Sequence, residues 1–263
     1  MITSLHSPHV EAVKALLGSR GAKERRASSK YVVEGLQNVR AILEFSPDSI
    51  EVLYHTEEGI SKVRDVPADL KLIEVSPQVM NAMSDTVTSQ GVLALANIEP
   101  KSIDSLSKTK DSLQIAYFWE IQDPGNAGTV IRAADAFGFD AVAFSNNSVD
   151  VYSPKVVRST AGSFWQIPIF DGVELSEIQK LAKLQKCEIF ITDADGTLEL
   201  PVAAKTAKAE SAIWIFGNEA RGLPAEIADE LDGKLVRIPM TGRAESLNLA
   251  TAAAVVMYAV ATA

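Results

Sequence analysis

Cysteine and long apolar runs are scarce in this sequence, and each scarcity excludes a class of protein. Cys187 is the only cysteine, so no disulfide can form within the chain. The longest apolar run, 247–263, is interrupted by Asn248 and Thr251 and is shorter than the roughly 20 residues that span a bilayer. The chain shows no charged-then-apolar signal segment near Met1. We therefore expect a cytoplasmic protein with no membrane partner.

Metal-binding and nucleotide-binding signatures are also missing. The three histidines, His6, His9 and His55, lie in the N-terminal part, which leaves none for a Ser-His-Asp hydrolase in the rest of the chain. Neither the P-loop pattern G-x-x-x-x-G-K-[ST] nor a G-x-G-x-x-G following a strand occurs. The sequence therefore predicts no metal site and no P-loop or dinucleotide-binding fingerprint.

Positive charge is in deficit overall, since the net charge is −9, which argues at first against a nucleic-acid partner. The charge is unevenly distributed, however. Segment 14–40 carries seven basic residues against Glu24 and Glu34, a local net charge of +5. A solvated helix face explains such a run as well as a phosphate-binding surface does. The candidate phosphate-binding residues within it are Arg20, Lys23, Arg25 and Arg26.

The sequence pattern divides the chain into two parts. Residues 1–100 combine short strand-like runs with polar segments and predict a small α/β domain. Its expected elements are a helix over 10–17, a basic loop over 18–26, strands over 31–33, 50–54, 70–75 and 92–96, and a helix over 36–45. The serine- and lysine-rich segment 101–111 predicts a linker.

Apolar strands alternate with helices from residue 112 to residue 263. Continuous apolar runs such as "LQIAYFWEI" and "SAIWIFG" are followed by helical segments such as "GTVIRAADAF" and "LPAEIADEL". This alternation predicts an α/β domain whose parallel sheet is covered on both faces. Ligands of such sheets bind beyond the carboxyl ends of the strands.

Three polar, glycine-containing segments each follow a predicted strand. They are "QDPGNAG" (122–128), "GNEARGLP" (217–224) and "MTGRAESLN" (240–248). Each alone is typical of an ordinary turn. Because parallel strands bring their carboxyl ends to one edge, we expect the three loops to converge around a ligand.

The first of these loops predicts a helix with an unusual cation. Asn126 is a good N-cap for a helix over 127–137 that Gly138 closes. Arg132 then lies in the second turn, where the helix dipole disfavours a cation by about 0.3–1 kcal/mol. An anionic or hydroxyl partner explains an arginine there, and an ion pair with Asp135 or another carboxylate is the alternative.

The polar loops carry a family resemblance. In this order, "NAGTVIRAADAFGFDAV", "IFGNEARGL" and "IPMTGRAESLNLATAAAVVMYA" resemble the three signature motifs of the SpoU (TrmH-like) branch of the SPOUT RNA methyltransferases. "VEGLQNVRAIL" and the basic segment before it resemble that family's small substrate-binding domain, which is of the ribosomal-protein (L30e-like) type. The resemblance implies an RNA substrate-binding domain over 1–100, a linker over 101–111 and a methyltransferase domain over 112–263.

The resemblance also implies an S-adenosylmethionine-dependent enzyme that methylates a ribose 2′-hydroxyl of RNA. It implies an α/β methyltransferase domain tied in a trefoil knot, and a homodimer in which the apolar final helix packs into the core and the dimer interface. The implied cofactor-binding residues are Gly217, Asn218, Ile238, Met240 and Leu247. The implied catalytic residues are Asn126, Arg132, Glu219, Ser246 and Asn248.

The implied chemistry needs a group that accepts the proton of the ribose hydroxyl. A guanidinium with a pKa above about 12 cannot readily take a proton, so we expect Arg132 to stabilise the developing alkoxide. Glu219 or a water then accepts the proton. Asn126, Ser246 and Asn248 position the ribose and the loop, and the last two also cap the final helix.

Several alternatives stay open at this point. Arg158, on a helix that Ser153 caps, contacts either RNA phosphate or a surface carboxylate. Ribosomal RNA of the 23S type is the first expected substrate and transfer RNA the second. A non-catalytic RNA-binding protein with the same fold, or a small-molecule enzyme that needs nothing from 1–100, also fits the pattern.

Overall fold

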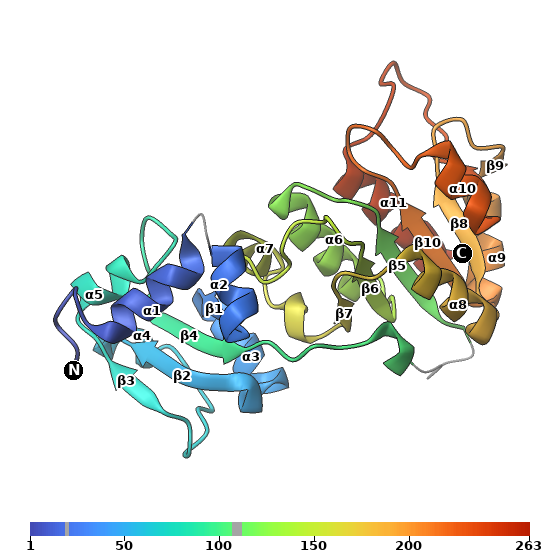
Figure 1. Ribbon diagram of the computed structural model, residues 1–263. Coiled ribbons are helices and arrows are strands. Elements are labelled where there is room, and N and C mark those ends of the chain that lie inside the picture. Colours follow the sequence, from blue (N-terminus) through green and yellow to red (C-terminus); the bar gives the residue numbers. More distant parts are fainter. Residues whose placement is uncertain (19–20, 107–111) are drawn as a thin grey trace. The chain divides into compact units, whose positions relative to one another are not determined.

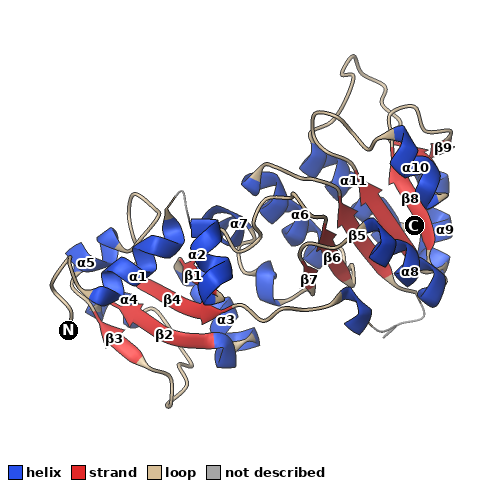
Figure 2. Ribbon diagram, viewed as in Figure 1, coloured by secondary structure: helices blue, strands red, loops and turns tan. Residues whose placement is uncertain are grey.

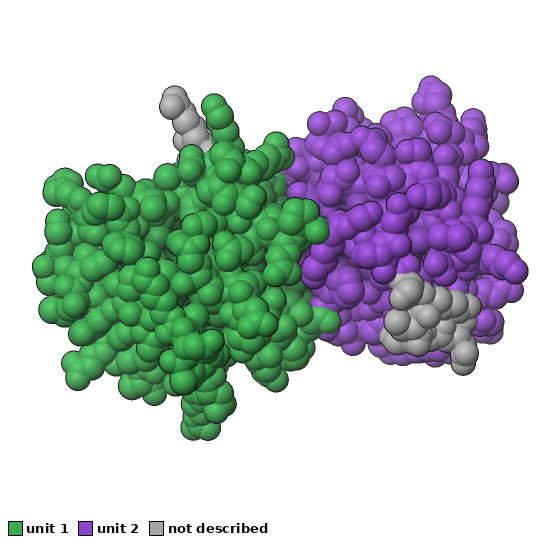
Figure 3. All heavy atoms as spheres, turned by 60° about the horizontal axis from the view of Figure 1, so that its bottom comes forward, with its two compact units in different colours: residues 1–100, 150–166 green, residues 101–149, 167–263 purple. Residues whose placement is uncertain are grey.

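The computed structural model describes residues 1–18, 21–106 and 112–263, which form two compact units (Figure 3). Unit 1 comprises Met1–Pro100 and Asp150–Gln166, and unit 2 comprises Lys101–Val149 and Ile167–Ala263. The division differs from the expected one at 150–166, because this segment belongs by its contacts to the N-terminal unit.

Unit 1 is built on a four-stranded sheet in the order β1-β4-β2-β3, in which β1 and β2 pair antiparallel with β4, and β3 pairs parallel with β2. The strands are β1 (Lys30–Glu34), β2 (Ile50–His55), β3 (Leu72–Glu74) and β4 (Val92–Asn97). The helices are α1 (Pro8–Leu17), α2 (Gly21–Ser28), α3 (Leu36–Phe45), α4 (Glu57–Ile60), α5 (Pro77–Ala82) and α7 (Pro154–Ser159), with 3-10 turns η1 (Pro47–Ser49) and η3 (Ser163–Trp165). Side chains of α1 and α5 pack on this sheet and form the core of the unit.

Residues 21–26 of the segment expected to be a basic loop lie in the helix α2, so the prediction was wrong for them. Arg25 of this helix is only 4% exposed. Its guanidinium pairs with Asp150 at 2.7 Å and also donates to the carbonyl of Leu16. Charge counting could not show this, because the partner carboxylate lies far away in the sequence.

Aromatic packing holds 150–166 in unit 1. The Tyr31 ring lies 5.1 Å from Tyr152 and 5.9 Å from Phe164, centroid to centroid. Trp165 Nε1 donates to the Tyr31 hydroxyl at 3.0 Å. Burial raises the pKa of Tyr31 above its ordinary value, so this hydroxyl stays neutral inside the cluster.

Unit 2 contains the expected parallel sheet, which confirms an α/β fold. Its strands follow the order β7-β6-β5-β10-β8-β11-β9, and the pairs between the described strands are parallel. They are β5 (Gln114–Phe118), β6 (Ala141–Phe144), β7 (Ile169–Phe170), β8 (Glu188–Thr192), β9 (Leu198–Glu199), β10 (Ala212–Phe216) and β11 (Lys234–Arg237).

Helices cover both faces of this sheet (Figures 1 and 2). They are α6 (Pro124–Ala136), α8 (Leu175–Gln185), α9 (Leu200–Ala209), α10 (Ala225–Leu231) and α11 (Leu249–Thr262), with the 3-10 turn η2 (Ile103–Ser105). On one face α8 and α10 share a core with Ile213 and Ile215 of β10. On the other face α11 packs against α6 and α9.

Helix α6 begins earlier than expected, and Asn126 is not its N-cap. Asp123 caps the helix, since its Oδ1 accepts from the Asn126 backbone N–H at 2.8 Å, and Pro124 occupies the first turn. Gly138, with φ of 71°, follows the C-cap Phe137, as expected. Because Asp123 caps the helix, the Asn126 side chain is free to make other contacts.

Helix α11 buries one face within the chain, formed by Ala250, Ala253, Val256, Met257 and Val260. Ala253, Val256 and Met257 are fully buried, whereas Val255 is 37% and Tyr258 57% exposed. The described residues therefore leave part of one apolar helix face uncovered.

Candidate active site

Polar loops follow two neighbouring strands of the unit 2 sheet. Strands β5 and β10 pair in parallel and end at Phe118 and Phe216, so the segments after them leave the same edge. The third loop, 238–248, leaves β11, which β8 separates from β10, and leads into α11. Its end must therefore come back across the edge to meet the other two.

One residue from each loop forms a continuous chain of hydrogen bonds. Asn126 Nδ2 donates to Glu219 Oε1 at 3.2 Å, and Asn248 Nδ2 donates to Asn126 Oδ1 at 3.2 Å. The structure thus brings together three of the five expected catalytic residues. Asn248 is also the N-cap of α11, since its Oδ1 accepts from the Ala250 N–H at 2.9 Å.

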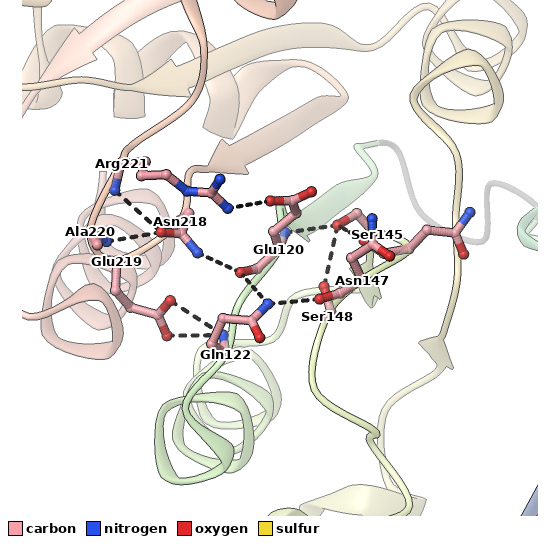
Figure 4. A network of polar contacts seen from close by, with 10 residues as sticks. Glu120, Gln122, Ser145, Asn147, Ser148, Asn218, Glu219, Ala220 and Arg221 are labelled. Atoms are coloured by element: carbon pink, nitrogen blue, oxygen red, sulfur yellow. Dashed lines mark hydrogen bonds and ion pairs between the residues drawn. The ribbon is translucent and has the colours of Figure 1, made fainter. Parts of the chain in front are cut away.

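Glu219 ties the second loop to the segment that leads into α6 (Figure 4). Besides the Asn126 amide, its carboxylate accepts from the backbone N–H groups of Gln122 and Asp123, each at 3.3 Å. A carboxylate close to a helix N-terminus is electrostatically favoured. Glu219 therefore links the second loop to the first.

Asn218 organises its own loop. Its Nδ2 donates to the Glu120 carbonyl at 2.7 Å, and its Oδ1 accepts from the N–H groups of Ala220 and Arg221 at 3.0 and 3.2 Å (Figure 4). Only 8% of Asn218 is exposed. Its side chain thus acts on the loop backbone, a role that the resemblance did not specify.

Gly217 is needed for a close approach within the same loop. A Cβ at this position would lie 2.3 Å from the carbonyl carbon of Gly222, a distance that real Cβ atoms do not show. The backbones of Asn218 and Gly222 pair here through two hydrogen bonds of 3.0 and 2.9 Å. The glycine thus permits the turn that aims the loop at the site.

The third loop presents apolar side chains outside the core. Met240 is 40% exposed, and Ile238 and Leu247 are partly exposed, on a segment without helix or strand. Ser246 is exposed, and the structure shows no hydrogen bond from its hydroxyl to any described residue. Ser246 therefore lies on the third loop but does not join the hydrogen-bonded chain Asn248–Asn126–Glu219.

Arg132 projects from the exposed side of α6. Among the residues that the structure describes, it has no hydrogen bond or ion pair, and the alternative pair with Asp135 does not form. Its guanidinium is therefore available to a ligand.

The expected RNA-binding residues divide into three groups. Lys23 and Arg26 are exposed on α2, whereas Arg25 is buried and paired. Arg158 pairs with Glu34 and with Asp85, the latter at 2.8 Å, so the alternative of a carboxylate partner is the one that forms. Arg20 lies outside the described residues.

A polar network that the sequence motifs did not indicate supports the site (Figure 4). Ser145 Oγ accepts from the Glu120 N–H at 2.7 Å, and Gln122 Nε2 donates to the Asn147 carbonyl at 2.7 Å. Arg221 pairs with Glu120 at 2.7 Å. The signal was present, because a polar run directly follows the strand that becomes β6, next to β5.

No helix in the described ranges is long and apolar enough to cross a membrane. No group of three or more His, Cys, Asp or Glu side chains there is placed to hold a metal ion.

The parallel sheet and its joined strand-end loops define an α/β protein with a candidate ligand site at the carboxyl edge. The family model of the SpoU rRNA methylases matches residues 113–258, and the model of the MRM3-like substrate binding domain matches residues 8–94. The chain belongs to the SpoU rRNA methylase family.

Known relatives are similar along nearly the whole chain. The 23S rRNA (guanosine(2553)-2′-O)-methyltransferase RlmP of Bacillus subtilis is 30% identical over 90% of both chains. The 23S rRNA (uridine(2479)-2′-O)-methyltransferase of Streptomyces viridochromogenes is 26% identical over 93% of this chain and 86% of its own. The crystal structure of the SpoU methyltransferase AviRb from Streptomyces viridochromogenes with AdoMet superposes with a TM-score of 0.84, at 25% identity, covering 97% and 98% of the chains.

Proposed function

We propose that the protein transfers a methyl group from S-adenosylmethionine to a ribose 2′-hydroxyl of ribosomal RNA of the 23S type. The observation that carries this proposal is the hydrogen-bonded chain Asn248–Asn126–Glu219, which joins the three family motifs at one sheet edge. Membership in the SpoU family and the names of the relatives supply the reaction and the RNA class.

The residues at the sheet edge fit this cofactor. Ile238, Met240 and Leu247 offer apolar side chains that an adenine ring would cover, and Gly217 lets the neighbouring backbone approach closely. When bound, S-adenosylmethionine supplies a methyl group on a positively charged sulfur, and loss of this methyl group leaves a neutral thioether. No acid is then needed to assist the leaving group.

The protein's own task is to prepare the ribose hydroxyl. Arg132 is exposed and has no protein partner in the described part of the chain. In this proposal its guanidinium stabilises the developing alkoxide or an adjacent phosphate. Glu219 is already engaged by two backbone N–H groups and the Asn126 amide. This engagement favours a water as the proton acceptor, with Glu219 holding the loops. Asn126, Ser246 and Asn248 then position the sugar.

Transfer of a methyl group to a mapped nucleotide tests the function. We expect 23S rRNA from cells that lack the protein to gain one 2′-O-methyl, located by mass spectrometry, when treated with the protein and cofactor. Arg132→Ala should lose this transfer but keep cofactor binding in calorimetry. Lys205→Ala is the matched control, because it also removes one positive charge from an exposed helix position, on α9. Methylation of transfer RNA alone would move the substrate to the second candidate.

A non-catalytic RNA-binding protein is the rival interpretation. It requires that the cofactor not bind, so calorimetry of the wild-type chain with S-adenosylmethionine separates the two. The pH dependence of transfer then separates the two proton acceptors. If Glu219→Gln keeps the rising limb of the pH profile, Glu219 is not the base, as the geometry favours.

RNA backbone binding by α2 is part of the proposal. Lys23 and Arg26 are exposed and free to approach phosphate, whereas Arg25 is committed to Asp150. Because the proposed substrate is ribosomal RNA, the proposed place of action is the cytoplasm.

A homodimer also belongs to the proposal. Val255 and Tyr258 are exposed on α11, and the ring of Phe137, the C-cap of α6, lies 5.7 Å from the Tyr258 ring, centroid to centroid. They offer the apolar face that a second copy would cover. We expect a dimer in sedimentation and a shift to monomer for Tyr258→Asp. The trefoil knot implied by the resemblance predicts a slow, threading-limited phase in refolding.

A further inference from the structure

Glu120, just after β5, has a backbone conformation that is unusual for a glutamate. Its φ is 48°, in the left-handed region where a Cβ crowds the backbone. Lys186 and Asp232 of unit 2 share this conformation as the C-caps of α8 and α10, an ordinary place for it, whereas Glu120 follows a strand. Such a conformation persists only where the surroundings hold it, and residues of this kind cluster at functional sites.

The backbone of Glu120 is held by side chains from two other strand ends (Figure 4). Its N–H donates to Ser145 Oγ at 2.7 Å, just after β6, and its carbonyl accepts from Asn218 Nδ2 at 2.7 Å, just after β10. The carbonyl also accepts from Gln122 Nε2 at 3.0 Å. Because β5 lies between β6 and β10 in the sheet, Glu120 joins the ends of three adjacent strands.

The carboxylate of Glu120 contacts the second loop at another point. Its Oε2 pairs with Arg221 at 2.7 Å, and the Glu120 side chain is 20% exposed. Asn218 and Arg221 both belong to the turn that the two backbone hydrogen bonds between Asn218 and Gly222 close. Glu120 therefore holds this turn through its carbonyl at one end and through its carboxylate near the other. Two fixed points on a hydrogen-bonded turn set its orientation relative to the sheet.

The turn carries residues of the candidate site. Gly217 precedes it, and Glu219 lies within it and accepts from the Asn126 amide. We propose that Glu120 is a positioning residue, which holds segment 217–222 in the orientation that binds S-adenosylmethionine. If this orientation is less populated, the apparent affinity for the cofactor falls in proportion. The inference rests on the proposed function, because it assigns to that cofactor site a residue that sets its affinity.

Glu120→Gly separates the carboxylate from the backbone conformation. Glycine adopts a φ of 48° without strain, so the variant keeps the course of the chain after β5 but loses the ion pair with Arg221. The matched control is Asp232→Gly, at the exposed C-cap of α10 with a φ of 50°. Both variants place glycine in the left-handed region of unit 2 and remove one negative charge.

Calorimetry of the full chain with S-adenosylmethionine measures the cofactor affinity. Relative to Asp232→Gly, we expect Glu120→Gly to raise the dissociation constant about two- to fivefold, the range for loss of an ion pair with one exposed partner. Both variants should keep the unfolding temperature of the wild type. In methyl transfer to 23S rRNA, KM for the cofactor should rise while kcat stays within about twofold. A merely structural defect would lower kcat instead, through the fraction of active protein.

The other end of the ion pair provides an independent test. Arg221→Met should raise the dissociation constant as Glu120→Gly does, whereas Arg221→Lys keeps the positive charge and should retain most of the affinity. Because both residues act through one contact, Glu120→Gly combined with Arg221→Met should bind the cofactor no more weakly than either single variant. Multiplying losses in the double variant would overturn the inference.

The outcomes separate this inference from the proposed function. If the wild type methylates the RNA and Glu120→Gly binds the cofactor as tightly as Asp232→Gly, Glu120 is not a positioning residue although the enzyme stands. If the wild type binds the cofactor without transferring a methyl group and Glu120→Gly still binds it more weakly than its control, the inference stands and the proposed reaction falls. If the wild type binds no S-adenosylmethionine, both are overturned.

Discussion

Replacing Arg158 by methionine should lower the stability of unit 1, because it breaks the ion pair that joins residues 150–166 to Glu34. The Glu34 side chain is 5% exposed and that of Arg158 26% exposed, so the substitution leaves a nearly buried carboxylate without its counterion. Loss of one partner of a fully buried pair costs about 3–5 kcal/mol. Ser84 Oγ and the Asp85 N–H still bond to the carboxylate, and Arg158 is partly solvated, so we expect about 2 kcal/mol.

The second ion pair of Arg158, with Asp85, adds little to the stability of unit 1. Asp85 is 40% exposed and its pair with Arg158 is worth about 0.2–1 kcal/mol. Urea unfolding, with amide hydrogen exchange of the 150–166 peptides, measures the loss in unit 1. Glu34→Gln in the Arg158→Met background removes the stranded charge and should recover about 1 kcal/mol. A cost below about 0.5 kcal/mol for Arg158→Met, or strictly additive effects, would refute the reasoning.

Three further predictions concern the loop at Gly217, the buried Tyr54 and the helix α2. Gly217→Ala forces a Cβ to within 2.3 Å of Gly222, so calorimetry should show a loss of cofactor binding, and unchanged affinity would contradict the turn geometry. Burial raises the pKa of Tyr54 from 10.0 to about 12, which disfavours ionisation in the folded state. Its contribution to stability is therefore complete below pH 10 and is lost as the pH rises from 10 to about 12, and Tyr54→Phe should flatten this loss in alkaline unfolding curves. Lys23→Ala with Arg26→Ala should lower the salt slope of RNA binding by about 1.4–1.8, whereas an unchanged slope would remove α2 from the interface.

The sheet and its loops were predictable because their causes are local. Continuous apolar strands alternating with helices define a parallel sheet, and its strand ends must share an edge. The meeting of Asn126 with Glu219 follows directly from this topology. The N-cap of α6 was misplaced by three residues because Asp123 and Asn126 are both good capping residues, and only the backbone of Pro124 decides between them.

Other features depend on contacts between distant segments. Arg25 was expected to bind phosphate, and Arg158 to contact either phosphate or a carboxylate. Each neutralises a carboxylate in unit 1, Asp150 and Glu34 respectively. A basic residue next to a polar loop carries no mark of its eventual partner. The short β9 and the helix α9 were also missed, since two strand residues give no detectable period.

The assignment of 150–166 to unit 1 has a consequence for how the molecule can be divided. The polypeptide passes between the units three times, after Pro100, after Val149 and after Gln166. Deleting residues 1–100 would therefore strip Tyr152, Phe164 and Trp165 of the Tyr31 cluster they pack with. Residues 1–100 therefore cannot be removed without exposing the remaining part of unit 1. Loss of methylation after such a deletion would reflect this damage before it showed anything about RNA.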